Sequence, residues 1–143
     1  MNIKSLLVAF ASGFLATLLF HQGGLLGLWA LGAVPAFPWD LTPVPPLGVP
    51  RVLSLAFFGG LWGFPCLFLG SWILKKGPVA FYWLGLTLFG SIFPTLVAML
   101  IVFPMKGIEV SAKLVIGGLI LNALWGFGVA IGLKVSKVVH GLS

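Results

Sequence analysis

From Val52 to Leu74 the sequence runs for 23 residues without a charged side chain, between Arg51 and the pair Lys75 and Lys76. A helix of this length would be about 35 Å long, which is enough to cross the roughly 30 Å hydrocarbon core of a bilayer. In lipid the backbone polar groups of such a run must bond to one another, which a helix achieves. The run therefore predicts a transmembrane helix, and Pro65 is the expected position of a kink.

Three further apolar runs predict that the chain crosses the membrane four times. The 143 residues are 60% hydrophobic and 7% charged, and their mean hydropathy is +1.20, far above that of soluble domains. We expect an all-α fold, a bundle of four transmembrane helices in a single domain over residues 1–143, with the lipid bilayer as its partner. The expected spans are 5–34, 52–74, 79–103 and 114–133.

The first run is longer than a bilayer requires, and its polar segment at 21–24 allows a bend. One geometry is a single long or kinked helix over 5–34; the other is a span that ends near His21, followed by a short interfacial helix. We favour the long helix. We also expect this segment to be retained and not cleaved as a signal peptide, because apolar sequence resumes at Leu25 and no clear cleavage site follows.

The stretch 35–51 cannot be a transmembrane helix, because six of its 17 residues are proline. It predicts an outer loop folded against the mouth of the bundle. Asp40 lies within the loop and Arg51 closes it, so we expect these two side chains to form an ion pair. An exposed pair of this kind contributes only about 0–1 kcal/mol.

The net charge of +6 does not predict nucleic-acid binding, because the basic residues are scattered at the ends of the apolar runs and form no basic face. With four spans, five of them lie on the side of both termini: Lys4, Lys75, Lys76, Lys134 and Lys137. Three lie on the other side: Arg51, Lys106 and Lys113. By the positive-inside rule both termini are cytoplasmic, which predicts a multi-pass protein of a bacterial inner membrane with N-in and C-in topology.

His21 and Gln22 form the most suggestive polar pair. An imidazole beside an amide at the end of a span can ligate a metal or haem, relay a proton or bind a quinone carbonyl. The plainer interpretation, which we favour, is a polar helix end bonded to the backbone or to the outer loop. The other histidine, His140, falls on the opposite side, so we expect no bis-histidine site, no metal and no cofactor.

Trp62 and Trp125 lie in the middle of their spans, where they could stack on a ligand or fill space between helices. We favour packing, with Asn122 as a polar partner for Trp125. The remaining aromatic anchors fall at the ends of spans, as a membrane belt requires: Trp29, Trp39, Trp72, Tyr82 and Trp83.

Two features suggest close helix packing. The letters LWGF occur at 61–64 and again at 124–127. Two explanations are open: a duplicated helix pair, or a chance match between glycine-rich helices. Small residues spaced four apart also predict helix contact faces. These pairs are Ala9 with Gly13, Ser12 with Ala16, Gly59 with Gly63, and Gly128 with Gly132.

Three segments, Phe20–Gly24, Pro38–Gly63 and Pro94–Gly107, resemble a family of small uncharacterised bacterial integral membrane proteins. The resemblance covers most of the chain. It implies a bacterial four-span protein and carries no activity with it.

We find no catalytic motif, so the first hypothesis is a non-enzymatic accessory or structural subunit that packs with itself or with a larger inner-membrane complex. An alternative is a small oligomeric channel or transporter lined by Ser91, Thr95 and Asn122. The least favoured is a lipid- or quinone-handling enzyme that would use His21 and Asp40.

Overall fold

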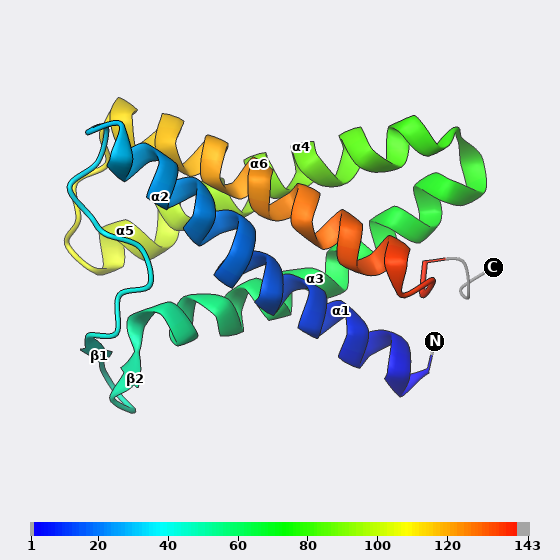
Figure 1. Ribbon diagram of the computed structural model, residues 1–143, viewed down its shortest axis with the longest axis horizontal. Coiled ribbons are helices and arrows are strands. Elements are labelled where there is room, and N and C mark those ends of the chain that lie inside the picture. The colour runs from blue at the N-terminus through cyan, green and yellow to red at the C-terminus, as the bar shows by residue number, and fades with distance from the viewer. Residues whose placement is uncertain (1, 140–143) are drawn as a thin grey trace.

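The computed structural model describes residues 2–139 and is a bundle of four long helices (Figure 1). The first consists of α1 (Ile3–Ala16), the π-helical turn η1 (Thr17–His21) and α2 (Gln22–Ala30). The second is α3 (Arg51–Lys76). The third consists of α4 (Val79–Val97), a second π-helical turn η2 (Ala98–Val102) and the short α5 (Phe103–Met105). The fourth is α6 (Ala112–Val135).

The four helices alternate in direction, so the chain has two distinct ends (Figure 1). What we call the terminal end holds Asn2, the Gly77–Pro78 turn between α3 and α4, and the C-terminal end of α6. What we call the loop end holds residues 31–50, between α2 and α3, and residues 106–111, between α5 and α6.

Each long helix has the length and hydropathy to cross a membrane. The stretches contain 28, 26, 27 and 24 residues, and most of their large apolar side chains face outward, where lipid would cover them. A soluble protein would not leave so much apolar surface exposed, so the architecture is that of a four-span integral membrane protein.

The first helix continues through Gly23 and Gly24 without a break. At η1 the N–H of Gln22 bonds to the carbonyl of Thr17, five residues earlier, and this one wide turn absorbs the irregularity. Of the two geometries considered for this segment, the structure has the long helix.

The four predicted contact faces meet in two pairs, one between α1 and α3 and one between α1 and α6. A Cβ atom added to Gly63 would collide with the carbonyl oxygen of Ala9, and one added to Gly13 would collide with that of Gly59, so α1 and α3 touch backbone to backbone. On another side of α1, a Cβ on Gly132 would lie 2.6 Å from Ser12 Oγ. Only glycine permits such close approach, and this fixes α1 between α3 and α6.

The pair α4–α6 repeats the arrangement of α1–α3. A Cβ on Gly126 would lie 2.5 Å from the carbonyl oxygen of Leu86, and one on Gly90 would lie 2.8 Å from that of Asn122. Thus the glycine of each LWGF sequence meets the backbone of the preceding long helix. This agreement of contacts favours a repeated helix pair over a chance match of four letters.

Tyr82 corrects one prediction, because it is not part of the aromatic belt. Its ring is fully buried beside Leu86, and its hydroxyl donates a 2.7 Å hydrogen bond to the carbonyl of Ala130 on α6. Position near a helix end suggested an interface anchor, but the side chain points inward and needs a polar partner there.

Candidate functional site

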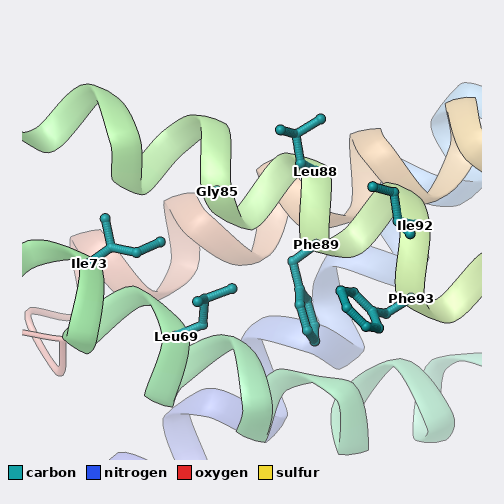
Figure 2. Close-up of a pocket in the computed structure, with 7 residues that line it drawn as sticks. All are labelled: Leu69, Ile73, Gly85, Leu88, Phe89, Ile92 and Phe93. Atoms are coloured by element: carbon teal, nitrogen blue, oxygen red, sulfur yellow. The ribbon is translucent and has the colours of Figure 1, made fainter.

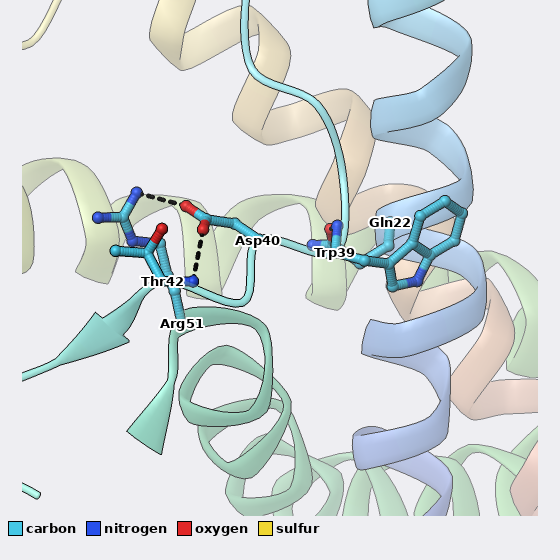
Figure 3. A network of polar contacts seen from close by, with 5 residues as sticks. All are labelled: Gln22, Trp39, Asp40, Thr42 and Arg51. Carbon is cyan, nitrogen blue, oxygen red and sulfur yellow. Dashed lines mark hydrogen bonds and ion pairs between the residues drawn. The ribbon is translucent and has the colours of Figure 1, made fainter. Parts of the chain in front are cut away.

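The loop of residues 31–50 is held against the first helix by Trp39, and its Phe37 also packs edge to face on Trp29 of α2, with 5.0 Å between ring centroids. The backbone N–H of Trp39 donates a 2.7 Å hydrogen bond to Gln22 Oε1, and its indole Nε1 donates a 2.9 Å bond to the carbonyl of Leu18. Trp39 has a φ of 55°, in the left-handed region that tryptophan seldom adopts. In Figure 3 the indole lies against the first helix while the chain continues away from it towards Asp40.

The acceptor of the indole hydrogen bond, the Leu18 carbonyl, lies within the π-helical turn η1. In an α-helix the N–H of Gln22 would bond to the carbonyl of Leu18, but here it bonds to the carbonyls of Thr17 and Leu19. The Leu18 carbonyl accepts the Trp39 indole instead. The irregular turn and the loop contact therefore form one structural unit.

Asp40 and Arg51 form the expected ion pair, with 2.7 Å between Arg51 Nη1 and Asp40 Oδ2 (Figure 3). The backbone N–H of Thr42 also donates to Asp40 Oδ1, at 2.8 Å. Hydrogen bonding by Thr42, together with the weaker effect of the Arg51 charge, lowers the pKa of Asp40 below its ordinary value. The pair closes the loop over a short antiparallel hairpin of β1 (Pro43–Val44) and β2 (Val49–Pro50).

His21 lies next to this unit without joining Asp40. Its Nδ1 is 3.3 Å from Gln22 Nε2, whereas the Asp40 carboxylate is bonded to Arg51 and Thr42. Gln22 is buried and uses both ends of its amide, so it connects His21 to the loop backbone. His140 lies outside the described residues, and residues 2–139 contain no group of three potential metal ligands. This geometry supports the role of a bonded helix end.

Trp125 has a different partner from the one predicted. Its indole Nε1 donates a 3.0 Å hydrogen bond to the carbonyl of Gly13 on α1, while Asn122 Nδ2 donates at 2.9 Å to Thr95 Oγ1 on α4. The two side chains are one turn apart on α6 but bond to different helices, so the prediction that Asn122 serves Trp125 was wrong. Spacing along one helix could not reveal which neighbouring helix each face meets.

Trp62 packs by aromatic contact. Its ring meets Phe89 of α4 edge to face, with 6.0 Å between centroids, and its indole makes no hydrogen bond to any described residue. It is half-buried, whereas Trp125 is almost completely buried. Each tryptophan of the LWGF sequences thus connects the pair α1–α3 to the pair α4–α6. Trp62 does so by a ring contact with Phe89, and Trp125 by a hydrogen bond to Gly13.

The three side chains considered for a channel lining are engaged between α4 and α6. Ser91 Oγ donates to the carbonyl of Leu119 at 2.9 Å, and Thr95 is buried under Asn122. Within the described part of one copy, these groups bind each other or the backbone and do not face a common channel.

An apolar groove between α3 and α4 was not predicted from the sequence. It has a volume of about 430 Å³ and is largely open, with lining side chains from both helices (Figure 2). Its lining is Leu69, Ile73, Gly85, Leu88, Phe89, Ile92 and Phe93. Sequence reasoning missed it because a groove lined by ordinary span residues has no polar marker.

Comparison with known proteins finds no matching family model, no matching curated protein and no matching solved structure. No family is therefore identified, and the resemblance noted above contributes only the expectation of four membrane-length helices, which the structure has.

Proposed function

We propose that this protein is a non-enzymatic subunit of a membrane assembly, which packs with further copies of itself or with a larger complex of a bacterial inner membrane. The expected topology, with both termini in the cytoplasm, would place the loop end outside. The proposal depends on surfaces for contact and not on a reactive centre.

One observation carries the proposal: a small-residue face on α2 that has no partner within the described chain. Gly23 and Gly27 are four residues apart, and a Cβ added to either would have no neighbouring atom within 4 Å. The four pairs singled out in the sequence are used inside the bundle, so they no longer argue for a partner. Open faces of this spacing allow transmembrane helices to approach closely.

The polar residues of the loop end fit the same interpretation. Gln22 and Trp39 hold the loop against the first helix, and Asp40 and Arg51 close it. These contacts hold the loop against the first helix at Leu18 and Gln22, and Gly23 directly follows Gln22 in the chain. Structural use of these groups supports a contact protein over an enzyme.

The test is the mass of the particle purified from its native membrane in mild detergent. We expect a homo-oligomer or a stoichiometric complex, and we expect the double variant Gly23→Leu, Gly27→Leu to reduce it to a monomer of 15.2 kDa. Gly117→Leu is the matched control, because Gly117 also has open space around it but lies on α6.

A monomer with no bound partner in the unmodified protein would overturn the proposal. An oligomer that conducts solute in proteoliposomes, and loses that flux in Asn122→Leu, would replace it with the channel hypothesis.

A further inference from the structure

The groove between α3 and α4 begins at the turn that joins them. The two helices diverge from Gly77 and Pro78, and side chains from both line the space between them (Figures 1 and 2). Ile73 and Gly85 lie nearest to the turn, and Phe93 lies farthest from it. From Gly85 to Phe93 the helix rises about 12 Å, which gives the length of the groove along α4.

The shape of the groove is fixed by its own side chains. Gly85 leaves a notch in which an added Cβ would lie 2.5 Å from the end of Ile73. Phe89 and Phe93 are stacked, with ring centroids 4.8 Å apart, and Trp62 supports Phe89 from behind. These contacts hold the aromatic wall in place, so little ordering remains for an occupant to complete.

The lining is hydrocarbon, and the groove opens to the side of the bundle. Leu88, Ile92 and Phe93 are exposed at its rim, in the middle of a helix that would span the membrane. What surrounds this part of such a helix is lipid tails, so a flexible acyl chain is the occupant that both the lining and the location favour.

Positive charge lies beyond the end of the groove nearest to the turn. Lys76 is one helical turn past Ile73, and its ammonium lies 5.3 Å from the centre of the Trp72 ring, at the depth expected for lipid head groups. A basic side chain at the end of an interhelical groove attracts an anionic head group. We propose that the groove binds one acyl chain of an anionic phospholipid, whose head group lies against Lys76. This inference is independent of the proposed assembly.

The experiment measures how strongly the protein immobilises spin-labelled phosphatidylglycerol and spin-labelled phosphatidylcholine in phosphatidylcholine vesicles. We expect the protein to prefer phosphatidylglycerol. Lys76→Gln should lower that preference about five-fold, the factor for one lysine near an anionic surface. Lys113→Gln, a change of the same kind at the loop end, should leave the preference unchanged.

A second pair of variants tests the groove itself. Leu88→Trp adds bulk at the rim of the groove and should remove most of the immobilised phosphatidylglycerol, whereas Leu84→Trp, at an exposed position one turn away on α4 that does not line the groove, should not. Equal binding of the two lipids by the unmodified protein, or unchanged binding in Leu88→Trp, would overturn the proposal. So would a change of particle mass in Leu88→Trp, because the occupant would then be a second copy of the chain.

Discussion

The helix pairs α1–α3 and α4–α6 meet at the interfaces of α1 with α6 and of α3 with α4, and one of these is closed while the other is open. The contacts of the pairs relate Ala9 to Leu86, 77 residues later, and Gly63 to Gly126, 63 residues later. With these offsets α1 corresponds to α4, and α3 corresponds to α6. The interface of α1 with α6 therefore corresponds to the interface of α4 with α3. The first is tightly packed, and the second contains the groove.

Side-chain volume accounts for the difference. In the closed interface Ser12 meets Gly132, so the helices approach until a Cβ no longer fits. The corresponding residues in the open interface are Phe89 and Leu69, and both line the groove. Large side chains keep α3 and α4 apart where small ones let α1 and α6 touch. Two helix pairs with the same backbone packing can thus form different interfaces: the interface of α1 with α6 is closed, and the interface of α3 with α4 is open to a ligand.

The largest expected effect tests whether the helix pairs α1–α3 and α4–α6 have the same close backbone packing. Gly63→Val and Gly126→Val should each destabilise the fold by about 3 kcal/mol or more, because the new side chain meets backbone that cannot move aside. The measurement is the free energy of unfolding in mixed micelles titrated with a denaturing detergent. Gly117→Val, with open space around it, is the control. Tolerance at only one of the two glycines would mean that the pairs are not packed alike.

A smaller effect should separate the two tryptophans. Trp125→Phe removes the hydrogen bond to Gly13 and should cost about 1–2 kcal/mol, whereas Trp62→Phe removes no such bond and should cost less. The same unfolding titration measures both. Equal losses would show that ring volume, and not the hydrogen bond, determines the stability of the closed interface.

The spans were predictable because hydrocarbon leaves a long apolar run little choice but helix. Which helix each face meets was not predictable. Trp125 and Asn122 lie within one turn of α6, yet one bonds to α1 and the other to α4. The answer depends on where α1 and α4 cross α6, which spacing along α6 does not contain.

At the loop end, charge complementarity was enough to predict the ion pair of Asp40 with Arg51. The contact of Trp39 with Leu18 was not predictable, because its acceptor is a backbone carbonyl released by a π-helical turn. Composition has no means of marking such an atom. The sequence therefore indicated the residues of this region better than the bonds between them.

The smallest expected effect concerns the loop, which makes the first helix pair different from the second. Only α2 and α3 are joined by a long connection held by an ion pair, whereas residues 106–111 link α5 to α6. Because folding of the loop lowers the pKa of Asp40, the carboxylate stabilises the loop fully above 3.8, the ordinary value. That stabilisation is lost as the pH falls below 3.8.

A nitroxide on Leu47→Cys would report this change, since position 47 is exposed and the native Cys66 is buried. The label should gain mobility as the pH falls below 3.8. The further variant Asp40→Asn should be slightly more mobile than the unmodified loop at neutral pH and respond little to acid, because it carries no titrating group at the ion pair. Mobility of the label in Asp40→Asn equal to that of the unmodified loop would mean that the contacts of Trp39 and Phe37 with the first helix hold the loop without the ion pair.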